Sequence, residues 1–357
     1  MMAFVASMPE TVVRGCIDAC LEGHPNVPGM IVDARGPDAD VCVAAGFADR
    51  DHLEPMTFAH VFRIASNTKT FVAAASMRLV ETDAFRLDDA IETMLPGDVR
   101  SVLSSRYDLS AITIRMLLQH TSGIASHDTG SHDGWSAFLE RVRRDPTHQW
   151  TALEQIEFSV EHFPPTHAPG AAMQYTDTGY VVLGQLLEHI TNARLASLVR
   201  EHCRFDALGL GSTWWERYES APSPLPPRAR VQMNDEDWEP VDCSIDLHGG
   251  GGLVSSVRDL TTWWRALFRD EVLQADNRAL MLSPLAPSDE THGDAGLGLF
   301  SRSVAGRTWW THSGYWGSIV LHDPTADLTI TAFRNQSELR TSALEPTYEA
   351  ILAAVTP

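Results

Sequence analysis

Residues 61–79, VFRIASNTKTFVAAASMRL, place Ser66 three positions before Lys69 in an otherwise apolar segment. Lys69 is the only lysine in the chain, and the other 26 of the 27 basic residues are arginine. Guanidinium stays charged at any working pH whereas a desolvated amine can lose its proton, so a position that keeps lysine is a candidate for proton chemistry. A helix that begins near Ser66 would put both side chains on one face. The stretch predicts a nucleophile beside its activating amine, although a solvated serine and lysine give the same spacing.

The composition indicates a globular, enzyme-sized protein. A chain of 357 residues with 44% hydrophobic content can bury a large core, in one domain or in two subdomains that share a site. The formal net charge of −20 argues against nucleic-acid binding, which needs basic patches. Five scattered cysteines without a C-x-x-C pair fit reduced thiols. Because we find no export signal and no membrane-length apolar run, we expect a cytoplasmic protein that does not bind membranes. We also expect a small-molecule substrate, and we make no prediction of the oligomeric state.

Two kinds of hydrophobic period divide the chain. A helical period predicts helices over 9–22, 66–79, 87–94, 112–119, 152–161, 176–190 (just after Tyr175), 195–203, 256–268 and 342–355. Short β-branched or aromatic runs predict strands over 29–34, 40–47, 298–304, 308–312, 318–322 and 328–333, the last four as an antiparallel meander. This order predicts an α+β fold in which both ends of the chain build one sheet. We expect a single unit, 1–357, with a sheet subdomain (about 1–62 and 290–357), a helical subdomain (about 63–289) and a cleft between them.

Two other polar stretches invite functional readings that we do not favour. His127, Asp128, His132 and Asp133 lie in a glycine-containing loop, but their spacing is not one that zinc sites use, so we expect a loop at the rim of the site and no metal. The glycine run at 249–252 precedes a helix without the lysine of a phosphate-binding loop, which favours a tight turn. We therefore expect no cofactor.

Three motifs stand in order along the chain: Ser66-x-x-Lys69, Tyr175-Thr176-Asp177 and His312-Ser313-Gly314. Together they resemble the Ser-x-x-Lys, Tyr-x-Asn and Lys/His-x-Gly motifs of the serine hydrolases related to class C β-lactamases and penicillin-binding DD-peptidases. That family also includes esterases, D-aminopeptidases and D-amino-acid amidases. The resemblance covers roughly residues 44–335, including FRIASNTKTF, LLQHTSGI, YTDTGYVVLGQLLE and GGLVSSVRDLTTW. It implies a β-lactamase-like fold, with an antiparallel sheet flanked by N- and C-terminal helices plus an all-helical subdomain.

The resemblance also implies a role for each motif residue. Ser66 would be the acylated nucleophile, Lys69 its activating group, and Tyr175 the residue that passes protons to and from it. The oxyanion hole would come from the backbone N–H groups of Ser66 and Tyr315. Gly314 would leave room for a substrate lying along the strand.

Two departures from the family pattern bear on the substrate. His312 stands where β-lactamases have lysine, and this His-x-Gly pattern is similar to that of the D-aminopeptidase and D-amino-acid amidase branch. A histidine is a weaker anchor for a substrate carboxylate than a lysine. Asp177 replaces asparagine and could hold Lys69 protonated, attract a substrate ammonium, or serve only as a helix N-cap. We favour D-aminoacyl amides or short peptides as substrates. A carboxylesterase, a β-lactamase and a non-turnover acyl-binding protein are the alternatives.

Aromatic residues cluster near the same motifs. They could line a side-chain pocket, although core packing is the commoner use of such residues: Trp214, Trp215, Trp309, Trp310, Tyr315 and Trp316.

Overall fold

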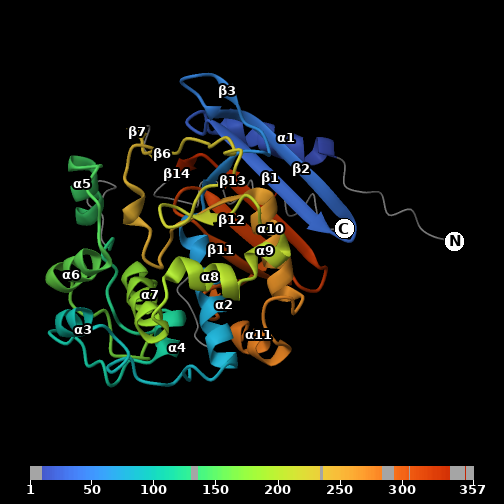
Figure 1. Cartoon of the computed structure of the whole chain (residues 1–357). Helices are drawn as coiled ribbons and strands as arrows, with labels where there is room; N and C mark the ends of the chain where they lie inside the picture. Colours follow the sequence, from blue (N-terminus) through green and yellow to red (C-terminus); the bar gives the residue numbers. More distant parts are fainter. Residues whose placement is uncertain are drawn as a thin grey trace.

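The central sheet has eight strands, and neighbouring strands in it all run antiparallel (Figure 1). The computed structural model describes residues 10–129, 136–233, 236–283, 293–304, 306–337 and 350. The strand order is β3-β2-β1-β13-β12-β11-β10-β9. The bounds are β1 Gly29–Gly36, β2 Ala39–Asp49, β3 Glu54–Pro55, β9 Asp294–Ala295, β10 Phe300–Val304, β11 Arg307–Ser313, β12 Ser318–Asp323 and β13 Leu328–Arg334.

The two distant parts of the chain meet where β1 pairs with β13. Val32 lies opposite Ala332, and six residues of β1 are in register with β13. Each of the seven residues of β13 is buried, as expected for a central strand covered on both faces. The prediction that both parts of the chain build one sheet is confirmed, and so is the meander from β10 to β13.

Helices cover both faces of the sheet. On one face, α1 (Glu10–Gly23) buries Val13, Ile17 and Cys20 against residues of β1, β2 and β13. On the other face, α10 (Val257–Phe268) packs against β13, β1 and β12. The hydroxyl of Ser256 caps α10 by accepting a hydrogen bond from the N–H of Asp259 at 3.1 Å. Both faces of the central strands are therefore removed from water.

The remaining helices gather on the α10 side of the sheet, away from α1 (Figure 1). α2 runs through their middle and is buried along most of its length, as its apolar sequence predicts. Their bounds are α2 Thr68–Glu81, α3 Gly97–Leu103, α4 Ile114–Leu118, α5 Ala137–Arg144, α6 Ala152–His162, α7 Asp177–Thr191, α8 Leu195–His202, α9 Phe205–Leu208 and α11 Ala275–Met281. None of the helices in the described ranges has the length and apolar character needed to cross a bilayer.

Two small three-stranded sheets complete the fold. One has the order β4-β8-β5, from Val61–Arg63, Leu253–Ser256 and Trp214–Trp215. The other has the order β14-β6-β7, from Gln336–Ser337, Gln232–Met233 and Glu236–Asp237. The pairing of β4 with β8 fixes the segment before Ser66 beside the segment after the glycine run.

Some expected elements are absent or differ. The expected helix at 87–94 is wrong, because this segment forms turns and bonds its backbone to residues 112–115 instead. The sequence reading missed α3, α5, α9, α11 and the two small sheets. The expected helix at 342–355 lies outside the described residues, apart from residue 350. The division into subdomains at about 62 and 290 stays a prediction. α10 falls within the expected helical subdomain, 63–289, yet it packs directly on the sheet.

Candidate active site

Ser66 lies in a one-turn 3₁₀ helix, Ala65–Asn67, that leads directly into α2. Ala65 has φ = +45°, a left-handed conformation that is costly for a residue with a side chain and that needs its surroundings to hold it. The hydroxyl of Ser318 on β12 supplies such support. It donates to the carbonyl of Ile64 at 2.9 Å and accepts from Asn67 Nδ2 at 2.9 Å. One sheet residue therefore holds the chain on both sides of Ser66, through the backbone of Ile64 and the side chain of Asn67.

Lys69 lies one turn further along α2 and is fully buried. Its Nζ donates to Ser66 Oγ at 2.9 Å, to the carbonyl of Gly250 at 2.6 Å, and to Asp177 Oδ1 in a short ion pair. An ammonium has three N–H donors, and three acceptors surround this one. The contacts therefore favour Lys69 in its charged form.

Gly250 approaches this group because it has no side chain. A Cβ at residue 250 would lie 3.2 Å from Asp177 Oδ1 and 3.6 Å from Lys69 Nζ. The expected tight turn at 249–252 is present. The carbonyl of Gly250 accepts a hydrogen bond from Lys69, a role that we did not predict from the sequence.

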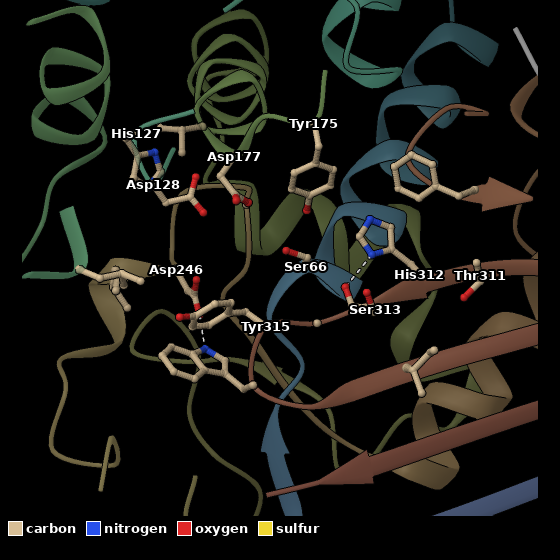
Figure 2. Close-up of a pocket in the computed structure, with 18 of the residues that line it drawn as sticks. Ser66, His127, Asp128, Tyr175, Asp177, Asp246, Thr311, His312, Ser313 and Tyr315 are labelled. Atoms are coloured by element: carbon tan, nitrogen blue, oxygen red, sulfur yellow. Dashed lines mark hydrogen bonds between the residues drawn. The ribbon is translucent and has the colours of Figure 1, made fainter. Parts of the chain in front are cut away.

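Tyr175 also faces Ser66, with its hydroxyl directed toward the serine (Figure 2). Its ring lies 5.1 Å from Lys69 Nζ and stacks on His120 at 4.4 Å between centroids. Burial raises the pKa of Tyr175 well above its ordinary value and the charge of Asp177 raises it further, while a hydrogen bond with Ser66 opposes both. Tyr175 is therefore a neutral phenol in the unliganded protein.

Asp177 is the first residue of α7, and the N-cap of that helix is Thr176, whose hydroxyl accepts from the N–H of Gly179 at 3.1 Å. The reading of Asp177 as only an N-cap is therefore wrong. Burial alone would raise the pKa of Asp177, but the Lys69 ammonium outweighs burial and brings the pKa below its ordinary value. Asp177 is thus the counter-ion of Lys69.

The end of β11 closes the site from the sheet side. Gly314 lies so close to the Ser66 segment that a Cβ there would be 2.1 Å from the carbonyl oxygen of Ile64 and 2.4 Å from Ser318 Oγ. We expected Gly314 to leave room for substrate. The structure gives a different reason for glycine, which is the close approach of β11 to the nucleophile segment. Tyr315 follows at once, and its hydroxyl contacts Met233 Sδ at 2.8 Å.

His312 is buried on β11 and faces the aromatic side of the site. Its ring packs against Phe300 and Tyr175, with centroids 5.5 and 6.3 Å away. Its Nδ1 lies 2.8 Å from the carbonyl oxygen of Ser313, which can only accept, so Nδ1 carries a proton (Figure 2).

A pocket of about 310 Å³ opens over Ser66. Its polar lining near the serine includes three carboxyl groups, those of Asp128, Asp177 and Asp246 (Figure 2). The apolar part of the lining includes Phe138, Leu139, Val181 and Ile245. The pocket thus combines the Ser66 hydroxyl, carboxyl groups and apolar side chains.

The carboxyl groups of Asp128 and Asp246 were not predicted as site residues. Burial and the adjacent charge of Asp177 raise the pKa of Asp128 to about 7. Burial also raises the pKa of Asp246, against a hydrogen bond that Trp316 Nε1 donates to it at 2.5 Å. The only signal for Asp128 in the sequence was the polar loop 126–134, and Asp246 carried none.

The metal and aromatic hypotheses have separate outcomes. His127 is buried against Thr178 and burial lowers its pKa to about 4, while His132 and Asp133 lie outside the described residues. No group of three potential metal ligands forms within the part of the chain that the structure describes. Of the six aromatic candidates, Tyr315 and Trp316 line the pocket. The others are buried in the core: Trp214, Trp215, Trp309 and Trp310.

The fold and the Ser66 site together define a known class of protein. The sequence profile of the β-lactamase family matches residues 16–354, so the chain belongs to the β-lactamase family. It is 24% identical over 302 residues to penicillin-binding protein 4* of Bacillus subtilis, which covers 81% of this chain and 63% of that protein. The chain thus spans less than two thirds of the length of that relative.

Two solved structures have the same fold over nearly their whole length. D-amino acid amidase from Ochrobactrum anthropi SV3, complexed with L-phenylalanine, is 23% identical with a TM-score of 0.82, covering 97% of this chain and 99% of the other. D-stereospecific amidohydrolase from a Streptomyces species is 25% identical with a TM-score of 0.78, covering 97% and 98%. The predicted β-lactamase-like α+β fold is confirmed. The family and these neighbours indicate a hydrolytic enzyme of the serine-hydrolase type.

Proposed function

We propose that this protein cleaves an amide or ester bond through an acyl-enzyme at Ser66, with D-aminoacyl amides or short peptides as its preferred substrates. One observation carries the proposal. Lys69 Nζ donates to Ser66 Oγ at 2.9 Å while the hydroxyl of Tyr175 faces the same oxygen, at the base of a pocket. A nucleophile between a cation and a proton-transfer group is the arrangement that acyl transfer needs.

The first half-reaction follows from these contacts. Because Ser66 Oγ accepts from Lys69, its own proton is directed to Tyr175. As Oγ bonds to the substrate carbonyl carbon, Tyr175 takes that proton and passes its phenolic proton to the leaving nitrogen or oxygen. The C–N or C–O bond then breaks, giving acyl-Ser66 and a neutral amine or alcohol.

The second half-reaction reverses the path. Water attacks the acyl carbon, its proton passes to Tyr175, and the phenolic proton returns to Ser66. Tyr175 is neutral before and after each step, so its high pKa is no obstacle to this shuttle. Lys69 stays charged and stabilises the negative charge that develops on Oγ.

The oxyanion hole belongs to the same proposal. Ser66 lies in the first turn of a helix, and the contact between Gly314 and Ile64 keeps Tyr315 close to it. The N–H groups of Ser66 and Tyr315 would hold the substrate oxygen, and donors of this kind contribute about 3 kcal/mol each to the barrier.

The pocket lining supports an amine-bearing acyl group. Arg302 and Arg334 also line the pocket, and Asp177 is paired with Lys69, so the carboxyl of Asp246 is the group that would hold a substrate ammonium. The apolar part of the pocket suits an aromatic or aliphatic side chain, such as that of phenylalanine. The fold neighbours named for D-amino acid amidase and D-stereospecific amidohydrolase activity support the same substrate class.

A small ester is the second candidate, because the same apolar lining accepts an uncharged acyl chain. A panel of D- and L-phenylalanine amide, N-acetyl-D-phenylalanine amide and p-nitrophenyl butyrate separates the two. We expect the highest kcat/KM with D-phenylalanine amide. A preference for the butyrate ester with no amide turnover would favour the esterase instead.

Mass spectrometry of the protein during turnover tests the acyl-enzyme. We expect a transient mass increase on the peptide that contains Ser66, and loss of turnover in Ser66→Ala but not in Ser104→Ala, which changes an exposed serine. Stable acylation without product release would instead make the protein an acyl-binding protein, and turnover by Ser66→Ala would exclude Ser66 as the nucleophile.

A further inference from the structure

Asp128 and Asp177 point their carboxyl groups at one another at the edge of the pocket (Figure 2). The steps proposed above use Asp177 only as the counter-ion of Lys69, and they use Asp128 not at all. Two carboxylates in contact inside a protein repel each other unless a proton or a cation lies between them. The pair therefore needs an explanation of its own.

Hydrogen bonds join the two aspartates through Ser126. The backbone N–H of Asp177 donates to Ser126 Oγ at 2.8 Å, and the Ser126 hydroxyl donates to Asp128 Oδ1 at 2.5 Å. The two carboxyl groups face each other, so a proton shared between them would close the ring (Figure 2). Asp177 also accepts from Lys69, so the Asp128 carboxyl is the group that would carry this proton.

The charges around the pair agree with a protonated Asp128. Lys69 supplies one positive charge, and Asp177 balances it. His127, next in the chain, is neutral because burial lowers its pKa to about 4. The phenols of Tyr175 and Tyr315 also sense Asp128 and are uncharged, while Asp246, Arg302 and Arg334 line the same pocket. Among the described residues, Lys69 is the cation in contact with the pair, and Asp177 already balances its charge.

We propose that Asp128, in its protonated form, is a positioning residue that holds Asp177 against Lys69, so that loss of the Asp128 proton lowers the reactivity of Ser66. This inference rests on the proposed function for its kinetic consequence. With the proton present, the carboxyl pair carries one negative charge and Asp177 stays on Lys69. Without the proton, the two carboxylates repel each other, Asp177 is displaced, and the added negative charge makes proton transfer to Tyr175 harder.

The direction of the pH dependence follows from this ring. The pKa of Asp128 is raised to about 7, so the protonated pair predominates below neutral pH and is lost as the pH rises through this range. A group that must stay protonated gives a rate that falls up to about tenfold per pH unit above its pKa. An asparagine at 128 keeps a neutral donor for Asp177 and cannot titrate.

The experiment measures the second-order rate of Ser66 labelling by a fluorophosphonate probe from pH 5.5 to 9.5, in wild type, Asp128→Asn and Asp128→Ala. We expect Asp128→Asn to label within about threefold of wild type at pH 6 and at least about tenfold faster than wild type at pH 9. Asp128→Ala, which has no donor, should label slowly at both. The titration of any group that the two proteins share cancels in the ratio of the two rates. Asp246→Asn is the matched control, because it removes a carboxyl from the same pocket and should retain the wild-type limb near neutral pH.

Equal pH profiles for wild type and Asp128→Asn would overturn the proposal. A second measurement does not depend on reactivity. Carboxyl ¹³C NMR of protein labelled at aspartate should show one side chain that titrates near neutral pH, absent from Asp128→Asn but present in Asp246→Asn and Ser66→Ala. If no such titration appears, Asp128 is not protonated and the proposal fails. If it appears but the probe labels no serine at 66, the carboxyl pair stands and the proposed function fails.

Discussion

Replacing Gly314 with alanine tests whether the spacing between β11 and the Ser66 segment controls reactivity. The added Cβ would lie 2.1 Å from the carbonyl oxygen of Ile64 and 2.4 Å from Ser318 Oγ. An ordinary contact is about 3.4 Å, so β11 and the Ser66 segment must separate by roughly 1.3 Å at this point. Neither neighbour is the free end of a flexible side chain, since Ser318 is itself hydrogen-bonded to Ile64.

A separation of this size has two measurable consequences. Misplacement of a reacting group by about 1 Å typically costs on the order of 10²-fold in rate, and loss of one oxyanion donor costs 10²–10³-fold. We therefore expect Gly314→Ala to label with a fluorophosphonate at least about 100-fold more slowly than wild type. Overpacking should also lower the free energy of unfolding by about 1–3 kcal/mol.

The assay compares the rate of Ser66 labelling with the midpoint of thermal unfolding in the same samples. Gly15→Ala is the matched control, because Gly15 is exposed in α1 and a Cβ there meets nothing within 4 Å. That control should label like wild type and gain about 0.5–1 kcal/mol of stability. Labelling of Gly314→Ala within threefold of wild type would refute the argument that close approach at Gly314 sets the reactive geometry.

Three further predictions concern charged and titratable residues. Lys69→Arg should lower the labelling rate at least about 10³-fold, because a planar guanidinium cannot reproduce three converging contacts in a fully buried site; a rate within tenfold of wild type would contradict this. Asp177→Asn keeps an acceptor but removes the counter-ion of Lys69, so chemical denaturation should show a loss of about 2 kcal/mol, and the preference for amine-bearing over neutral substrates should not change. A changed preference would mean that Asp177 binds the substrate amine. Burial lowers the pKa of His322 to about 4, below its value near 6.5 in the unfolded chain. As the pH drops from about 6.5 to 4, the unfolded state therefore takes up a proton first and the stability of the folded state falls. His322→Gln should flatten this decline in thermal melts, and an equally steep decline would exclude His322 as its source.

A single sequence could predict those helices and strands whose pattern of apolar and turn residues is sufficient to identify them. The strands β10 to β13 alternate or run apolar between clear turn residues, and they lie close to the expected ranges. α2 and α7 have long apolar patterns that only a buried helix satisfies.

The expected helix at 87–94 shows where this reasoning fails. Leu87, Ile91 and Leu95 have helical spacing and are buried, but they reach the core through turns. The N–H of Ile91 donates to the carbonyl of Ile112, and the N–H of Arg115 donates to the carbonyl of Leu87. Hydrogen bonds to a distant segment replaced those of a helix, and no local pattern reports such a partner.

The candidate site divides in the same way. The motif residues Ser66, Lys69 and Tyr175 could be proposed because their chemistry is specific and their order along the chain resembles a family. The carboxyl groups of Asp128 and Asp246 could not be predicted, because only the packing of separate loops brings them to the pocket. The structure adds a second reason for a lysine at 69, because three acceptors surround its amine in a fully buried site that an arginine would not fit.

The bond from Asn67 to Ser318 has a consequence for the order in which the protein can become reactive. Asn67 and Ser318 are separated by 251 positions, yet Ser318 holds the segment that contains Ser66. During synthesis Ser66 leaves the ribosome long before β12 exists, and until then nothing anchors Ile64 and Asn67 or brings Gly314 against them. A partly made chain therefore lacks the contacts that hold the Ser66 segment, and the proposed site can be complete only when the last strands join the sheet.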